Sequence, residues 1–315
     1  MNRVPKALSI IITIAGLLLT FPTCSKGKKN NQPFPSDIHV VLIGFDGWGS
    51  YSVEKADMPI LKQMMKDGSW TLKKRSVLPS SSAANWASMF MGASPEIHGY
   101  TQWNSQKPEI PSAVMGKNGI FPTISQILHA QHENAEIGLF CNWSVIKYIA
   151  DSQSINKVVH FPVKNLEEKY QGMTKLVDDY IIKKKPTLCT IVYDFPDYYG
   201  HSSGFDSSEY YQSLKDLDRC LESIIMATKE ADIYDRTIFI VTSDHGGNEK
   251  KHGGKTLKEM ETPFVIFGSN IKKGYEIKEF MIQFDVAATI AYIFGLDTPQ
   301  VWIGRPVLSV FEEER

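Results

Sequence analysis

The chain has 315 residues, of which 43% are hydrophobic and 22% are charged, which are the proportions of a globular protein able to build one sizeable core or two modest ones. Its 34 basic and 35 acidic residues give a net charge of -1, which argues against DNA or RNA polymers as partners. A small charged substrate is compatible with this balance, and the composition gives no indication of a protein partner.

The first 23 residues are typical of an export signal. Arg3 and Lys6 precede the uncharged run ALSIIITIAGLLLTF (7–21), and a polar segment rich in Lys, Asn and Pro follows. The run is shorter than the roughly 20 apolar residues that a spanning helix needs. Cys24 lies where the signal would be cleaved, and the segment resembles a bacterial lipoprotein signal. The resemblance implies a lipid anchor on Cys24 in the membrane and a periplasmic or cell-surface protein, with plain secretion as the alternative; residues 24–36 are then a flexible tether.

Residues 37–315 alternate between strand and helix patterns. Short apolar, β-branched runs predict strands covered on both faces at 38–45, 188–193 and 237–242. Apolar residues at steps of three and four predict helices at 58–68, 123–132, 166–185 and 207–230. We therefore predict a single α/β domain with a central, largely parallel sheet sandwiched by helices. The loop-rich stretch 95–122 is expected to be an insertion over a functional site.

The remaining cysteines, Cys141, Cys189 and Cys220, are widely spaced and lie in apolar or helical contexts. No C-x-x-C pair indicates a metal knuckle. We expect buried thiols, with a disulfide between two of them as an alternative for one pair.

Acidic and imidazole side chains follow each of the three predicted strands. They are Asp46 after the first, Asp194, Asp197 and His201 after the second, and Asp244 and His245 after the third, with His252 close behind. Ligands of open α/β sheets bind outside the carboxyl ends of the strands, so these groups are expected to converge. Carboxylates gathered in a partly dry crevice repel one another unless a cation joins them, which predicts a metal site. Asp and neutral His together suit Zn²⁺ or Mn²⁺ better than Ca²⁺, and two clusters indicate two ions. We interpret Asp194 as a strand-end residue and not as a ligand.

These groups belong to a set of motifs spread along the chain: GFDG (44–47), PSSSAAN (79–85), PDYYGH (196–201), SDHGG (243–247), HGG (252–254) and GRPV (304–307). Their order and spacing resemble the alkaline phosphatase superfamily, and most of all its type I phosphodiesterase / nucleotide pyrophosphatase branch. The resemblance implies an alkaline-phosphatase-like catalytic domain over 37–315. It also implies one zinc ion on Asp197, His201 and His252, and a second on Asp46, Asp244 and His245. Ser82 is then the nucleophile and a ligand of the second ion, and Asn85 binds the phosphate.

The serines at 80–82 have two interpretations. Serines before an alanine-rich run most often form a helix N-cap. The resemblance instead implies that Ser82 attacks phosphorus, since coordination to a divalent cation lowers the pKa of a hydroxyl without a partner histidine. A helix beginning at Ser82 would also present free amides and its dipole to an anion. Most members of the branch carry threonine at this position, so the serine leaves the substrate subtype open.

The resemblance implies metal-dependent hydrolysis of a phosphate ester through a phosphoseryl intermediate on Ser82. A phosphodiester or nucleotide pyrophosphate is favoured, because the strand-end motifs contain no arginine to bind a dianionic monoester and Arg75 is the nearest in sequence. A phosphomonoesterase of the same superfamily is the alternative, and a non-catalytic surface-binding lipoprotein is an alternative of a different class. Aromatic residues near the motifs could stack a base or cage a cation, although they more often only pack: Trp48, Trp86, Tyr100, Trp103, Tyr198 and Tyr199.

Overall fold

The computed structural model describes residues 34–162 and 170–312. Residues Gln32–Arg315 form one compact unit. The predicted signal at 1–23, Cys24 and most of the predicted tether lie outside the described residues. In the two described stretches, no helix is long and apolar enough to cross a membrane.

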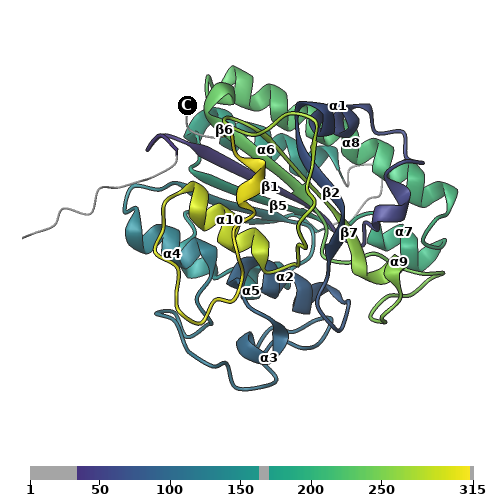
Figure 1. Ribbon diagram of the computed structural model, residues 1–315, viewed down its shortest axis with the longest axis horizontal. Coiled ribbons are helices and arrows are strands. Elements are labelled where there is room, and N and C mark those ends of the chain that lie inside the picture. Colours follow the sequence, from purple (N-terminus) through teal and green to yellow (C-terminus); the bar gives the residue numbers. More distant parts are fainter. Residues whose placement is uncertain (1–33, 163–169, 313–315) are drawn as a thin grey trace, which may run out of the picture. The chain divides into compact units, whose positions relative to one another are not determined.

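Within these residues the strands form one eight-stranded sheet in the order β4-β3-β5-β1-β6-β7-β2-β8 (Figure 1). In chain order the strands are β1 (His39–Phe45), β2 (Gly68–Arg75), β3 (Ile137–Cys141), β4 (Lys157–His160), β5 (Leu188–Tyr193), β6 (Thr237–Thr242), β7 (Glu261–Gly268) and β8 (Tyr275–Glu276). From β4 to β6 all neighbours are parallel, whereas β7 is antiparallel to both β6 and β2, and β8 is parallel to β2. The predicted largely parallel sheet is confirmed, and the predicted strands are the adjacent β5, β1 and β6 at its centre.

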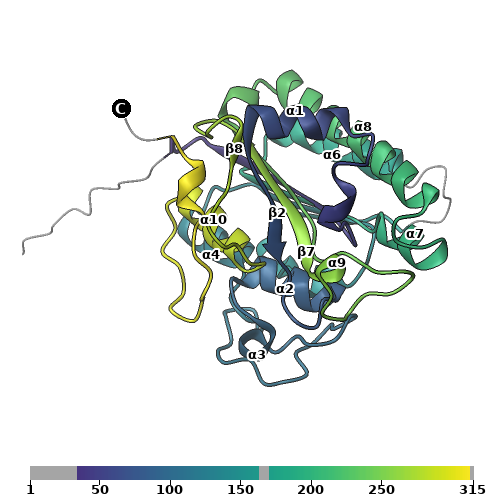
Figure 2. The same ribbon diagram turned by 45° about the vertical axis from the view of Figure 1, so that its right-hand side comes forward.

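Helices cover both faces of the sheet, which confirms the predicted sandwich (Figures 1 and 2). One face carries α1 (Pro59–Asp67), α6 (Gln171–Lys184) and α8 (Ser208–Glu230), and the other carries α2 (Ser82–Met91), α4 (Ile124–Gln131), α5 (Ile146–Ile149) and α10 (Asp285–Ile293). The shorter elements are α3 (Pro95–His98), α7 (Asp197–Ser202), α9 (Leu257–Met260) and the 3-10 turns η1 (Ser50–Ser52), η2 (Ser152–Ser154), η3 (Tyr234–Arg236) and η4 (Leu308–Val310). The predicted helices at 58–68, 123–132 and 207–230 correspond to α1, α4 and α8. The predicted helix at 166–185 corresponds to α6, and its first residues fall in the stretch 163–169 that the structure does not describe.

Successive side chains of the central strands enter different cores. In β1, Val40 and Leu42 join the core that contains α2, whereas Val41 and Ile43 join the core that contains α8. Full burial of such a side chain contributes roughly 1.5–3 kcal/mol to the stability of the fold, and side chains on both faces of the strand are buried in this way. An uninterrupted apolar run is therefore required here, and it fixes the position of the carboxyl end of β1.

The three cysteines of the described chain are free, so the disulfide considered for one pair is wrong. Cys141 packs in the core on the α2 side of the sheet, and Cys189 and Cys220 pack in the core on the other side. Burial raises the pKa of Cys141 to about 12 and that of Cys220 to about 11, so both remain neutral thiols. They act as small apolar side chains.

Gly44 is the penultimate residue of β1, and because it has no side chain, Trp86 of α2 can occupy the space beside it. A methyl group at Gly44 would lie 2.2 Å from Cη2 of the Trp86 ring. Trp86 is fully buried and donates its Nε1–H to Asp46 Oδ2 at 2.8 Å. The missing side chain at position 44 thus lets α2 pack closely against the strand end that carries Asp46.

We expect Gly44→Ala to displace the Trp86 ring and to lower the free energy of unfolding by about 1–3 kcal/mol, as overpacking of a core does. Urea unfolding measures this loss. Trp86→Phe removes the ring atoms that the methyl would meet, so Gly44→Ala should be less destabilising in a Trp86→Phe background. Equal losses in both backgrounds would contradict the proposed contact.

Candidate metal centre and active site

The carboxylates that follow the three central strands lie at one edge of the sheet. Asp46 directly follows β1, Asp194 directly follows β5, and Asp244 comes shortly after β6. The strands end level with one another, because Phe45 pairs with Tyr193 and Gly44 pairs with Thr242. The parallel register therefore brings together groups that are far apart in the sequence.

The first Asp/His group consists of Asp197, His201 and His252. Their ligand atoms all lie within 4.8 Å of one another. Asp197 and His201 are four residues apart, and α7 places both on one face, with His201 Nε2 at 3.3 Å from Asp197 Oδ2. His252 Nε2 lies 3.0 Å from His201 Nε2 and 3.8 Å from Asp197 Oδ1. These residues are the ones expected to hold the first ion.

The second Asp/His group consists of Asp46, Asp197 and His245, and its ligand atoms also lie within 4.8 Å of one another. Asp197 therefore belongs to both groups, which the sequence did not predict. Asp244, expected in this group, lies beside it, with Oδ2 at 3.3 Å from His245 Nε2. The other Asp244 oxygen accepts the Gly47 N–H at 3.1 Å.

Backbone carbonyls determine which nitrogen of each imidazole is free. The Nδ1 atoms of His201, His245 and His252 lie 3.0, 2.8 and 3.2 Å from the carbonyl oxygens of Lys250, Gly246 and Ser80. A carbonyl can only accept, so each Nδ1 carries a proton, and Nε2 of each ring is turned toward the cluster. This is the usual arrangement of metal-bound histidines.

Two carboxylate oxygens of the cluster are buried without a hydrogen-bond partner among the described residues, Asp197 Oδ1 and Asp244 Oδ2. Buried oxygens of this kind are costly to leave unpaired, because they have lost water without gaining a donor. Unpaired carboxylate oxygens that face imidazole lone pairs are the donor set of Zn²⁺ or Mn²⁺. The residues of both groups therefore fit a pair of divalent metal ions.

The pKa shifts show the same need for a cation. Burial raises the pKa of Asp46 well above its usual range, and the charges of Asp244 and Asp197 raise it further. Burial also raises the pKa of Asp244. In Asp197 the effect of burial is outweighed by the His201 hydrogen bond and nearby imidazoles, which hold its pKa below the ordinary value. Burial lowers the pKa of His245 to about 3, so this ring is neutral.

The serines at 80–82 have three different environments. Ser82 is the first residue of α2, and its Oγ lies 3.1 Å from His245 Nε2 and 3.5 Å from Asp46 Oδ1. Ser81 is the N-cap residue, but its side chain makes no capping hydrogen bond. Ser80 Oγ donates to the carbonyl of Gly254 at 2.6 Å. Of the three hydroxyls, Ser82 is the one placed against the second Asp/His group.

The side chain of Asn85 lies behind this position and is fully buried. Its Oδ1 accepts the N–H of Val77 at 2.7 Å, and its Nδ2 donates to the carbonyls of Pro79 and Ser81 at 3.0 and 2.9 Å. In the structure this amide holds the 77–81 loop that leads to Ser82. It lines no part of the cavity described below, so its expected contact with phosphate stays a prediction without support from this geometry.

Lys74 is a site residue that the sequence did not reveal. It is completely buried, and its Nζ donates to the Ser243 carbonyl at 2.9 Å and to Gln283 Oε1. Burial lowers its pKa to about 7, although the Asp244 charge opposes this shift. Lys74 faces inward where the register of β2 shifts between Thr71 and Lys74, a local irregularity that the charged run KKR does not indicate.

A cavity of about 440 Å³ opens over Ser82. It is lined by Ser82, Trp103, Trp143, Asp194, Asp197, Tyr198, His201, Ser202 and His252. Asp194 is part of this wall but of neither Asp/His group, and burial raises its pKa to about 7. Trp103 and Tyr198 are exposed at the mouth of the cavity, whereas Trp48, Trp86 and Tyr100 are buried.

Residues 40–262 match the sequence profile of type I phosphodiesterase / nucleotide pyrophosphatase. The chain belongs to this family. The family is part of the alkaline phosphatase superfamily, and the chain has the fold of that superfamily. The candidate Asp/His groups described above are consistent with its two-metal site.

Solved structures share the fold at low sequence identity. Murine ectonucleotide pyrophosphatase / phosphodiesterase 5, as an inactive variant in complex with AMP, gives a TM-score of 0.71 at 15% identity and covers 87% of this chain and 100% of that one. Phosphonate monoester hydrolase from Silicibacter pomeroyi gives 0.66 at 15% identity and covers 85% and 75%. At these identities the likeness shows the fold alone.

Curated relatives match only in part. Phosphopentomutase from Caldanaerobacter subterraneus subsp. tengcongensis is 31% identical over 126 residues, which are 40% of this chain and 30% of that protein. The human GPI ethanolamine phosphate transferase 2 catalytic subunit is 28% identical over 158 residues, which are 48% and 16%. The match thus spans less than a third of the length of either relative.

We expect Lys74→Met to weaken zinc binding by about tenfold, the effect of one pKa unit on a ligand carboxylate, because the ammonium stabilises the ionised form of Asp244. Competition with a chelator of known affinity measures the zinc dissociation constant. Lys73→Met is the matched control, since Lys73 is the exposed neighbour in β2. The role assigned to Lys74 is wrong if both folded variants change zinc affinity, or if neither does.

Proposed function

We propose that this protein hydrolyses a phosphodiester or nucleotide pyrophosphate bond through a phosphoseryl intermediate on Ser82. The observation that carries the proposal is the position of Ser82 Oγ, within 3.5 Å of both His245 Nε2 and Asp46 Oδ1 and open to the cavity. Family membership supports a reaction at a phosphate ester. The AMP named with the murine protein supports a small phosphate ester as substrate.

Two divalent ions, Zn²⁺ in preference to Mn²⁺, are the proposed cofactors. Asp197, His201 and His252 would hold one, and Asp46, Asp244, His245 and Ser82 would hold the other. When bound, such ions lower the pKa of a hydroxyl and offset the charge of the phosphoryl group and of the leaving oxygen.

In the proposed reaction Ser82 Oγ forms a bond to phosphorus, and the leaving group departs with the electrons of the broken P–O bond. Water then displaces Ser82 and releases the phosphorylated product. The start of α2 favours the added negative charge through its dipole. The amide of Ala83 does not contribute a free donor, because it donates to the Trp103 carbonyl at 3.0 Å.

The cavity wall favours a diester over a monoester. Among its described lining residues there is no arginine or lysine, and Asp194 and Asp197 add negative charge. A dianionic monoester would gain most from a guanidinium, whereas a monoanionic diester needs it less. Arg75 is paired with Glu261 at 3.2 Å and is not part of the wall. A phosphomonoesterase and a non-catalytic surface-binding lipoprotein remain the alternatives that experiment must exclude.

We expect zinc-loaded protein lacking the predicted signal to cleave bis(p-nitrophenyl) phosphate faster than p-nitrophenyl phosphate or p-nitrophenyl sulfate. Ser82→Ala should lower kcat by about a thousandfold or more, because the attacking oxygen is removed. Ser81→Ala is the matched control, and its kcat should stay within about threefold of the native value. A preference for the monoester would overturn the diester assignment, and unchanged turnover by Ser82→Ala would remove Ser82 from the reaction.

We also propose that the protein is exported and anchored in a bacterial membrane by a lipid on Cys24, on the basis of the sequence pattern at 1–24. In cells supplied with labelled palmitate, the native protein should take up label and sediment with membranes. Cys24→Ala should abolish both, and Ser25→Ala should abolish neither. An unlabelled native protein released from the membrane fraction would support plain secretion instead.

A further inference from the structure

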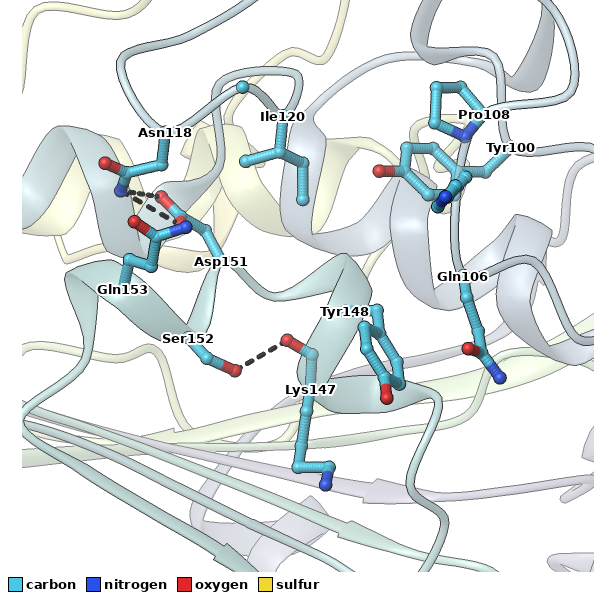
Figure 3. A pocket seen from close by; sticks show the side chains of 12 residues that line it. Tyr100, Gln106, Pro108, Asn118, Ile120, Lys147, Tyr148, Asp151, Ser152 and Gln153 are labelled. Carbon is cyan, nitrogen blue, oxygen red and sulfur yellow. Dashed lines mark hydrogen bonds between the residues drawn. The ribbon is translucent and has the colours of Figure 1, made fainter.

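A second cavity has a volume of about 420 Å³ (Figure 3). We call it the distal cavity. It is bounded mainly by residues 100–108, 118–120 and 147–153. Among the described residues it belongs to neither Asp/His group, and neither the motifs nor the proposed reaction uses it.

The two cavities share the chain segments that form their walls. Trp103 and Trp143 line the active-site cavity, and their rings are parallel, 8° apart in orientation with centroids 6.4 Å apart. Gln106 and Lys147, a few residues farther along the same segments, line the distal cavity. Three and four peptide units reach at most about 11 and 15 Å. Gln106 and Lys147 therefore lie within these distances of Trp103 and Trp143, and the same two chain segments border both cavities.

Tyr100 offers a hydrogen-bond donor to this cavity. Its side chain is 3% exposed, and Figure 3 shows its hydroxyl pointing into the space between Ile120 and the facing wall. The hydroxyl has no hydrogen-bond partner among the described residues. Burial raises the pKa of Tyr100 to about 12, so it keeps its proton. A hydroxyl that faces a cavity without a protein partner is available to donate to a ligand acceptor.

The charges around the distal cavity favour an anion. Lys107 and Lys147 line it, and in the described chain neither forms an ion pair. The one carboxylate in the wall is Asp151, which is 3% exposed and accepts hydrogen bonds from Asn118 (Figure 3). It also accepts one from Gln126. Two ammonium groups thus face a single carboxylate that is already satisfied. The active-site cavity, by contrast, has no lysine or arginine among its described lining residues.

We propose that the distal cavity binds an additional anionic group, such as a phosphate monoester, that the substrate carries outside the phosphodiester or pyrophosphate linkage that is cleaved. Lys147 and Lys107 attract the anion, and the Tyr100 hydroxyl donates to it. The proposal rests on the proposed function, because it assigns the far end of the same substrate. It makes the protein selective for substrates that carry a further anionic group outside the cleaved linkage.

NADP⁺ and NAD⁺ test the proposal, since both contain a pyrophosphate diester and only NADP⁺ carries an additional phosphate. We expect the native protein to show a higher kcat/KM for NADP⁺. Lys147→Gln should lower kcat/KM for NADP⁺ by about tenfold, as loss of a charged hydrogen bond does, while NAD⁺ and bis(p-nitrophenyl) phosphate are cleaved as before. Tyr100→Phe, which keeps the ring, should act in the same direction with a smaller effect.

Lys273→Gln is the matched control, because Lys273 is exposed and lies outside both cavities. Equal changes for NADP⁺ and NAD⁺ in Lys147→Gln, or no change for either, would overturn the proposal. If none of the three diesters is cleaved, the proposed function fails separately. Calorimetric titration of Ser82→Ala protein then decides the distal cavity: tighter binding of NADP⁺ than NAD⁺, lost in the Lys147→Gln double variant, supports it, and equal binding rejects it.

Discussion

The repulsion among buried carboxylates at the end of the central strands governs this structure. Asp46, Asp197 and Asp244 lie together almost out of contact with water, with exposures of 1%, 9% and 0%. Ionised carboxylates that are buried side by side repel one another strongly unless protons or cations neutralise them. Three imidazoles with their Nε2 atoms turned inward complete a donor set that fits a pair of divalent ions. The positions of the other site residues follow from this cluster.

The protein holds the cluster from several directions. The parallel strands β5, β1 and β6 end level with one another and supply the carboxylates. From α2, Trp86 donates to Asp46, and from β2, Lys74 donates to the carbonyl before Asp244. The Trp86 indole thus contacts Asp46 through a hydrogen bond, and the buried Lys74 ammonium acts on Asp244 through its charge. Rigid support of this kind keeps ligands in place before an ion binds.

In the proposed function, the two cavities divide recognition of an ester between them. Near Ser82, negative side chains and aromatic rings surround the reacting phosphate, and positive charge there must come from bound ions. Beyond Trp103 and Trp143, lysines and a tyrosine hydroxyl face a cavity that no metal group reaches. A remote anion can be bound there without competing with the reacting phosphate for the ions. The stretch 95–122 contributes to both walls, and this explains why a loop-rich segment with little regular structure lies at this place.

The sequence alone determined the α/β class, the central strands, most of the helices and the strand-end groups of the site. Those features depend on local patterns: apolar runs buried on both faces, helical spacing, and polar residues placed where a strand must end. Tertiary structure decided the rest, because it depends on contacts between distant residues. In the sequence, Lys74 has the pattern of a solvated charge run. In the structure, β2 pairs irregularly with β7, and this brings the Lys74 ammonium to Ser243, 169 residues away. In the same way, the loop around Asn85 occupies its amide, and the convergence of α7 with the turn after β6 puts Asp197 into both Asp/His groups, which no local pattern could indicate.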